Sequence, residues 1–236
     1  MPYDGLNVLI KALENDGGLE SHLIENTLFF RSDIVARQAE EMLTMVHDGK
    51  LPVRFATGKS IYITDDGYTH TRLFTNRTEA THICRTDDIY TSIRPGIRIK
   101  VDKDGNHWVR HTIKAFKGEL VSGGRKSTIK NYMISHIWGN TADPYFFSAL
   151  WNLALTPMHC SFILDKPDSH HQQIKGIKEL YKAICWELYR PDQLMEIEFP
   201  EIPERQYLEQ ARYYIDNCLL NFIPASGNND SANIRP

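Results

Sequence analysis

Hydrophobic residues recur every three or four positions between residues 32 and 48, which is the spacing of an amphipathic helix. The apolar positions of this segment are Ile34, Val35, Ala39, Met42, Leu43 and Val46. Ser32 lies where an N-cap residue would be expected, and Asp48-Gly49 supplies a stop signal. The pattern therefore predicts a helix between these two points, within a largely helical region that covers residues 1–50.

A second helical stripe lies in the later part of the chain. Its apolar positions are Ile174, Ile177, Leu180, Tyr181, Ile184, Cys185 and Leu188, and Arg190-Pro191 ends it. Residues 204–222 predict a final helix. Residues 224–236 are rich in small and polar side chains, and we expect this tail to be disordered.

From about residue 51 the pattern shifts towards alternation, which is typical of strands. Asp65-Asp66-Gly67 separates the alternating segments 61–64 and 68–74, and residues 102–105 separate 97–101 from 107–113. Both arrangements predict β-hairpins, so we expect residues 51–117 to be mainly antiparallel sheet. In this interpretation His107 and His111 lie on the same face of a strand. The sequence shows no third metal ligand near them, so we expect surface histidines and not a metal site.

The composition is that of a globular protein, with 42% hydrophobic, 24% charged and 11% aromatic residues among 236. Collagen, long disorder and coiled coil are thereby excluded. No apolar stretch is long enough to span a membrane and the N-terminus lacks the features of a signal peptide, so we expect a cytoplasmic protein without membrane contact. The four cysteines form no C-x-x-C pair, and we expect them to be reduced.

The net charge of −3 conceals an uneven distribution along the chain. Residues 94–130 carry ten Lys and Arg against three Asp and Glu, whereas residues 1–50 and 190–236 are both acidic. A local positive excess of this size can hold a polyanion through counterion release, even in a weakly acidic protein. The alternative interpretation, a solvated strand face that is basic by chance, remains open on this feature alone.

The segment 131–166 carries the candidate chemistry. A strand-like run ends in Ser135-His136, a loop follows, and a second apolar run begins at Asn152 and leads to a predicted helix. This strand, loop, strand, helix order resembles the HNH endonucleases, also called ββα-metal or His-Me finger nucleases. Ser-His-Ile at the first strand end and Trp-Asn-Leu at the second strand resemble the restriction-type branch of that family.

The resemblance implies a catalytic role for two residues. His136 corresponds to the family's general base, and Asn152, sixteen residues later, corresponds to its middle asparagine. A histidine with a pKa near 6.5 suits the deprotonation of water at neutral pH. The asparagine would tie the loop back to the strand, or present its carbonyl to a metal, so that the base keeps its orientation. The alternative is that both are buried polar residues with structural hydrogen bonds only.

The resemblance also implies a divalent metal ion, Mg²⁺ or Mn²⁺, to stabilise the charge of the phosphate and the leaving oxygen. Ser135 stands where many family members carry a ligand, and it is a weak one. The helix positions that match the family are Ser161 and Asp165, which share a helix face if the helix begins near Pro157. The expected order of metal ligands is Asp165, then His159, then Ser161.

The basic segment runs directly into the first strand, so we expect DNA contacts there. The candidate phosphate-binding residues are Arg125, Lys126, Lys130 and, from the far side of the site, Lys166. The aromatic residues of the loop, Trp138 and 145–147, could stack on bases, but packing beneath the site is the favoured role.

Together these features predict an α+β protein. Its parts are a helical N-terminal region (1–50), a basic antiparallel β region that binds DNA (51–128), a ββα nuclease core (129–190), a helical C-terminal region (191–223) and the tail. The expected function is metal-dependent cleavage of double-stranded DNA by a dimeric, sequence-specific restriction enzyme with a cognate methyltransferase as genetic partner. The alternatives are a non-catalytic DNA-binding regulator and a nonspecific nuclease toxin.

Overall fold

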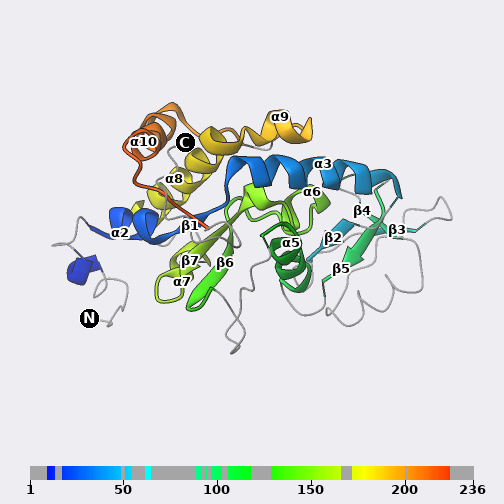
Figure 1. Cartoon of the computed structure of the whole chain (residues 1–236), viewed down its shortest axis with the longest axis horizontal. Helices are drawn as coiled ribbons and strands as arrows, with labels where there is room; N and C mark the ends of the chain where they lie inside the picture. Colours follow the sequence, from blue (N-terminus) through cyan, green and yellow to red (C-terminus); the bar gives the residue numbers. More distant parts are fainter. Residues whose placement is uncertain are drawn as a thin grey trace.

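The computed structural model describes residues 10–13, 18–48, 51–54, 62–64, 89–91, 94, 97–102, 106–117, 129–165, 172–199 and 201–223. Within these ranges, the side chains of residues 47–48, 62–64, 89–91, 162 and 165 are not part of the description. The described residues form an α+β fold, as predicted, in which long helices pack along a small mixed sheet (Figure 1).

The central sheet has four strands in the order β6-β7-β1-β8. β6 (Tyr132–His136) and β7 (Leu153–Pro157) form an antiparallel pair in which His136 lies opposite Leu153 and Tyr132 lies opposite Pro157. β1 (Leu28–Phe29) pairs antiparallel with β7, and β8 (Asn221–Phe222) pairs parallel with β1. Every residue of β7 is buried, so the strand carries buried side chains on both faces of the sheet, and its apolar run Leu153–Leu155 reflects this.

The two long amphipathic helices are confirmed as α3 (Ser32–Asp48) and α8 (Gln172–Tyr189). Figure 1 shows α3 beginning next to the central sheet and running along the molecule over α6 (Pro144–Phe147) and α5 (His107–Lys117) towards the smaller strand pairs. Ser32 does not act as the predicted N-cap: its hydroxyl donates to the carbonyl oxygen of Leu188 at 3.0 Å. The helix start is instead tied to the carbonyl of Arg31, which accepts from the backbone N–H groups of Ile34 and Val35.

One large hydrophobic core cluster of the described residues joins N-terminal, central and C-terminal parts of the chain. Its largest fully buried side chains include Trp151, Tyr181, Phe29, Phe30, Phe146 and Phe147. The Tyr181 hydroxyl lies 2.6 Å from the Thr27 hydroxyl, so α8 is also fastened to the chain just ahead of β1. The sheet and the packing of residues 129–190 thus also involve residues outside that range.

Residues 107–117 form helix α5 (His107–Lys117), so the prediction of a hairpin over 97–113 is wrong. Val109 and Ile113 are fully buried four residues apart, which is a helical spacing and not a strand spacing. The carboxylate of Asp102 accepts a hydrogen bond from the backbone N–H of Trp108 at 3.1 Å and satisfies a donor of the first turn. His107 and His111 therefore lie one helical turn apart, with ring centroids 4.6 Å apart.

In the described part of 51–117, only one of the two strand pairs is antiparallel, as was predicted for the whole region. β5 (Ile99–Val101) pairs in parallel with β2 (Leu51–Val53), and β3 (Tyr62–Thr64) pairs antiparallel with β4 (Ile89–Thr91). The predicted turn at 65–67 and the segment 68–74 lie outside the described residues. Within the described part, this region is thus two short strand pairs and a helix.

The chain ends also depart from the predicted pattern. The final helix, α10 (Arg205–Asp216), is shorter than the predicted span 204–222, because the chain turns back after it to form β8. The N-terminal region holds α2 (Gly18–Asn26) and α3 as predicted, but it also supplies β1. The tail at 224–236 lies outside the described residues. Every helix in the described part of the chain is too short or too polar to cross a lipid bilayer.

Candidate functional site

The predicted strand, loop, strand, helix order of residues 131–165 is confirmed. The connection between β6 and β7 contains the short helix α6 (Pro144–Phe147) and a single 3-10 turn (Leu150–Asn152). The helix that follows β7 is α7 (Ser161–Asp165), so it begins four residues later than the predicted start near Pro157. His136 ends β6, and Asn152 immediately precedes β7.

Asn152 is fully buried and its side-chain amide holds the connecting loop in place. Its Oδ1 accepts from the backbone N–H of Trp138 at 2.8 Å, and its Nδ2 donates to the carbonyl oxygens of Phe146 at 2.9 Å and Gly139 at 3.4 Å. One side chain therefore ties both ends of the loop to the start of β7. This is the tying role expected for it from the sequence.

The loop in turn orients the imidazole of His136. Its Nε2 lies 3.0 Å from the carbonyl oxygen of Phe147, and the two aromatic rings stack with an interplanar angle of 6°. Since a carbonyl oxygen can only accept, Nε2 carries the proton of the neutral ring, which leaves the lone pair of Nδ1 free to accept another. The arrangement gives His136 the tautomer and the fixed orientation that a general base requires.

Burial and a nearby cation keep His136 neutral. Desolvation is the larger cause and the positive charge of Arg54 the smaller, and together they lower the pKa of His136 from 6.5 to about 4. Arg54 follows β2, lies with its guanidinium carbon 5.6 Å from the Phe147 ring centroid and donates to Oδ1 of Asn106 at 2.9 Å. At neutral pH the ring is therefore neutral beside a fixed positive charge, and it is a weaker base than a free histidine with a pKa near 6.5.

The depressed pKa predicts acid sensitivity. Between pH 6.5 and about 4 the unfolded chain binds a proton at His136 and the folded chain does not, so stability present above pH 6.5 is lost as the pH falls. For this residue the loss from pH 7 to pH 5 is about 2 kcal/mol. Urea denaturation at the two pH values measures it. His136→Gln should remove this part of the difference, and the exposed control His111→Gln should retain it; equal differences in the two variants would contradict the prediction.

Of the predicted metal ligands, His159 and Ser161 are not brought to His136. His159 lies in the turn after β7, at the opposite end of the β6–β7 pair, and its Nε2 is 3.2 Å from Nε2 of His22. Four residues of strand, about 14 Å, separate the two ends of β6. The hydroxyl of Ser161 donates to the carbonyl oxygen of Met158 at 3.0 Å. Asp165 is the last residue of α7, and its side chain is not among those described.

Two of the three predicted ligands, His159 and Ser161, are therefore not found beside His136, and the prediction for Asp165 stays a prediction. Ser135, the residue before the base, is turned away as well, because its hydroxyl is buried and lies 2.8 Å from that of Thr156. Strand alternation explains this: neighbouring residues of β6 point to opposite faces of the sheet. Among the described residues, side chains able to hold a metal gather only at His22, His159 and Cys160.

Part of the basic segment is used inside the fold. Arg94 pairs with Asp143 at 3.0 Å, Lys100 lies 3.6 Å from the ring centroid of Trp108, and Lys117 is buried. Lys130, one of the predicted DNA contacts, is exposed directly before β6, and α5 adds exposed Arg110 and Lys114. The other predicted contacts, Arg125, Lys126 and Lys166, lie outside the described residues.

The aromatic side chains of the loop pack inward, as favoured by the sequence. Trp138 and Phe146 are buried and form edge contacts with Trp151 and Phe199. A cavity of about 440 Å³ opens beside them, with Arg94, Asn140, Asp143 and Glu198 among its lining residues. His136 does not line this cavity, so the candidate base and the cavity are separate features.

Sequence reasoning missed two groups that shape the site. Arg54 belongs to a segment with no catalytic pattern, and it reaches His136 only because β2 ends beside α6. The carbonyl of Phe147 is a backbone group, and no sequence pattern marks its role. His22 was missed as the neighbour of His159, since the two residues lie 137 positions apart.

The comparisons with known proteins define a family. The family model described as "Uncharacterised protein PM1201" matches residues 30–219, and the chain belongs to that family. A curated relative, "Uncharacterized protein PM1201" of Pasteurella multocida (strain Pm70), is 29% identical over 94 residues. These residues are 39% of this chain and 39% of the relative, so the match spans about two fifths of the relative's length. No solved structure matches the chain.

Proposed function

We propose that this protein is a metal-dependent endonuclease that cleaves double-stranded DNA, with His136 as the general base. The observation that carries the proposal is the chain of contacts from Asn152 to the loop and from the loop carbonyl of Phe147 to the His136 ring. Asn152 holds the loop, and the loop carbonyl of Phe147 accepts from Nε2 of the neutral His136 ring. The other ring nitrogen, Nδ1, is then the atom that can take a proton.

The chemistry follows from these contacts. Nδ1 of His136 takes a proton from a water molecule, and the resulting hydroxide attacks the phosphorus of a phosphodiester. The leaving oxygen departs with the electron pair of its bond to phosphorus and takes a proton from solvent, and the His136 ring then returns its proton to solvent. Arg54 stands where its positive charge attracts the phosphate and keeps the ring neutral between turnovers. The divalent ion implied by the resemblance, Mg²⁺ or Mn²⁺, would neutralise further phosphate charge. The described side chains do not form its expected ligand set, so we assign it no ligand.

A restriction enzyme is the finer form of the proposal. It rests on the resemblance of Ser135-His136-Ile137 and Trp151-Asn152-Leu153 to the restriction-type branch. Such an enzyme would act as a homodimer, because two equivalent sites cut the two strands of a palindrome. A cognate methyltransferase would then protect the host DNA, and its gene would be expected nearby.

The test is a cleavage assay with purified full chain, unmethylated plasmid and genomic DNA, in Mg²⁺, in Mn²⁺ and in EDTA. Discrete metal-dependent bands would support the restriction enzyme, and a metal-dependent smear would support a nonspecific nuclease of the toxin type. Intact DNA in every lane, together with a shift in a binding gel, would replace the proposal with a non-catalytic DNA-binding regulator.

Arg125 and Lys126 test where the DNA binds. Replacing both by alanine should weaken binding to all DNA sequences and lower the slope of log affinity against log salt by about one for each phosphate that is no longer neutralised. Fluorescence anisotropy at several salt concentrations measures this slope. The paired substitution of Arg205 and Arg212, exposed on α10, is the matched control. A slope unchanged in the first variant would place the DNA elsewhere on the protein.

A further inference from the structure

Three side chains that can bind a metal converge where α2 meets the turn between β7 and α7. His22 lies on α2, and His159 and Cys160 lie in the turn. The ligand atoms of the three residues, a ring nitrogen from each histidine and the cysteine Sγ, all lie within 4.8 Å of one another. The two Nε2 atoms are 3.2 Å apart.

These separations suit a tetrahedral zinc ion. Zinc binds imidazole nitrogen at about 2.0–2.1 Å and thiolate sulfur at about 2.3 Å. In a tetrahedron two such nitrogens lie about 3.3 Å apart, and nitrogen and sulfur about 3.5 Å apart. The nitrogen pair already has this spacing, and the sulfur needs a movement of about 1.3 Å at most to reach its own.

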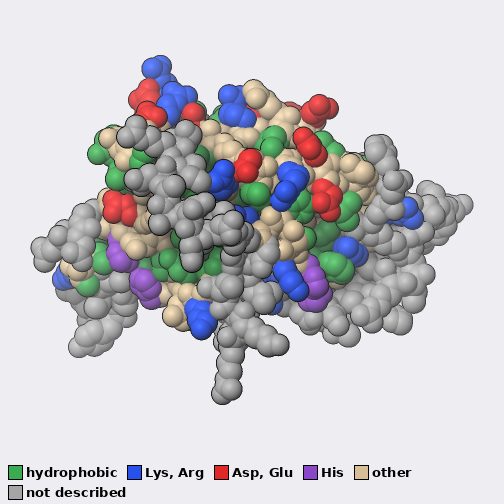
Figure 2. All heavy atoms as spheres, viewed as in Figure 1, with side chains coloured by type: hydrophobic (Ala, Val, Ile, Leu, Met, Phe, Trp, Pro, Cys, Tyr) green, Lys and Arg blue, Asp and Glu red, His purple; other side chains and the backbone are tan. Residues whose placement is uncertain are grey.

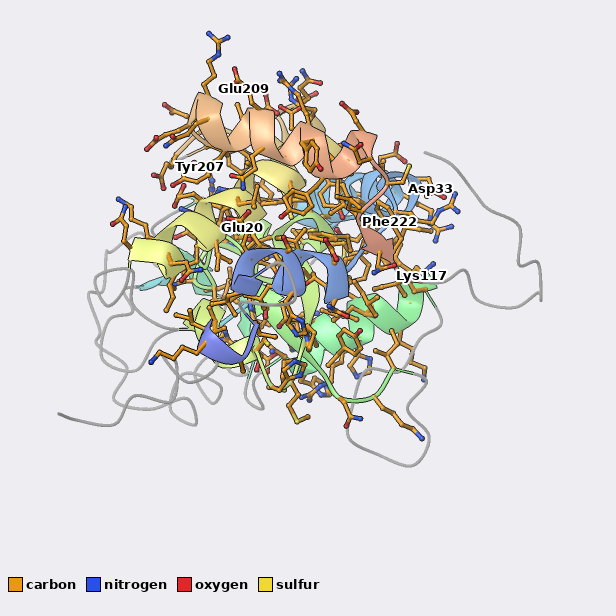
Figure 3. The ribbon with its side chains drawn as sticks, turned by 90° about the vertical axis from the view of Figure 1, so that its left-hand side faces the viewer. Glu20, Asp33, Lys117, Tyr207, Glu209 and Phe222 are labelled. Carbon is orange, nitrogen blue, oxygen red and sulfur yellow. The ribbon has the colours of Figure 1, made fainter. Side chains whose placement is uncertain are left out.

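Both sides of the cluster are held by contacts that do not involve the three side chains. On α2, the carboxylate of Glu20 accepts hydrogen bonds from Gln210 and Tyr214 of α10. Figure 3 shows Glu20 on α2 below α10, the helix that carries the labelled Tyr207 and Glu209. In the turn, the backbone N–H of Cys160 donates to the carbonyl oxygen of Pro157 at 2.9 Å. The fold thus presents the ligands together without help from a metal.

The burial of the three residues is graded. Cys160 is fully buried, His22 is partly buried and His159 is exposed, so one side of the cluster faces solvent. Figure 2 shows histidine side chains at the surface in the region of α2 and α7, apart from those over α5. Three protein ligands with an open fourth side are the arrangement in which a water molecule completes the coordination of zinc.

We propose that His22, His159 and Cys160 bind a zinc ion whose fourth ligand is water. A hydrogen bond between two neutral imidazoles could explain the His22–His159 distance alone, but it gives no reason for a thiol at the same point. Imidazole and thiolate ligands select zinc over Mg²⁺ or Ca²⁺, which prefer oxygen. Binding converts the Cys160 thiol to a thiolate and releases its proton to solvent.

The zinc site is separate from the proposed nuclease site. His159 and Cys160 follow the end of β7 that pairs with Tyr132, whereas His136 lies at the other end of the same strand pair. Zinc binding at the first end fastens α2 to the turn ahead of α7. The proposal therefore goes beyond the proposed function and does not depend on it.

The experiment uses the full chain, freed of metal by a chelator and dialysed. Zn²⁺ is titrated in competition with a chromophoric chelator, and the thermal midpoint is measured with Zn²⁺ and with Mg²⁺. We expect one zinc ion per chain and a rise of the midpoint with Zn²⁺ that Mg²⁺ does not produce. Co²⁺ in place of zinc should give a thiolate-to-cobalt absorption band that reports the sulfur ligand.

His22→Gln and His159→Gln should each weaken zinc binding at least about tenfold. His111→Gln and Cys218→Ser are the matched controls, because both residues are exposed and neither belongs to the cluster, and both variants should bind zinc as the unaltered chain does. Cys160→Ala should abolish the cobalt band. Equal zinc affinity in all variants, no shift of the midpoint, or no cobalt–thiolate band in the unaltered chain would each overturn the proposal.

Discussion

Replacing His136 by glutamine is expected to lower the rate of DNA cleavage by about 10²–10⁴-fold and to leave the affinity for DNA unchanged. Glutamine can still donate a hydrogen bond from its Nε2 to the carbonyl oxygen of Phe147, so the loop keeps its contact with the end of β6. It has no group that accepts a proton near neutral pH. Single-turnover cleavage and equilibrium binding, measured on the same DNA, separate the two effects.

His111→Gln is the control for this experiment, since His111 is exposed on α5 and its ring packs beside those of His107 and Trp108 on the same helix. It should cleave as fast as the unaltered protein. Cleavage by His136→Gln at more than a tenth of the original rate would mean that the histidine is a structural residue. A large loss of stability without a change in the rate per folded molecule would lead to the same conclusion.

Replacing Asn152 by alanine is expected to lower the free energy of unfolding by about 3–5 kcal/mol. The substitution leaves the buried N–H of Trp138 and the carbonyl oxygen of Phe146 without their partner, at roughly 1–3 kcal/mol each. It also opens a small cavity in the core. The urea midpoint and slope measure the change.

Asn152→Asp refines this test, because it keeps the volume of the side chain and the acceptor for Trp138. It replaces the amide donor by an oxygen that faces the carbonyl of Phe146, so it should also be destabilising. Asn217→Ala is the control: Asn217 is exposed, and its side-chain amide donates to the nearby carbonyl of Tyr213. It should cost less than about 1 kcal/mol. An equally small cost for Asn152→Ala would mean that other contacts hold the loop.

The elements that could be predicted from the sequence are those with long and unambiguous periods. α3 and α8 each carry several apolar positions at helical spacing, and β6 and β7 are apolar runs bounded by polar residues. α5 was mistaken for a strand because its short stretch from His107 to Ile113 satisfies both periods. What decides for the helix is the Asp102 carboxylate and the burial of Val109 and Ile113, both of which depend on the tertiary structure.

The candidate site could likewise be predicted from the sequence only in part. His136 and Asn152 are sixteen residues apart on adjacent elements, so their spacing reflects the geometry of one strand pair. Ser161 and Asp165 were predicted as the helix positions that match the family, with His159 close by in sequence. The structure places His159 in the turn before α7, at the other end of the β6–β7 pair from His136. The neighbours of His159 could not be foreseen, because tertiary packing and not nearness in sequence places α2 beside the turn.

The pairing of β1 has a consequence for the order in which the chain can fold during synthesis. The ribosome makes β1 early, but its partner β7 follows only at residues 153–157 and its other partner, β8, at residues 221–222. The β6–β7 pair is local and can form as it emerges, whereas β1 must wait for both partners. A nascent chain halted between β7 and β8 would hold β1 paired along one edge only. The open edge is then a site at which two unfinished chains can join, and its closure by β8 is one of the last steps of folding.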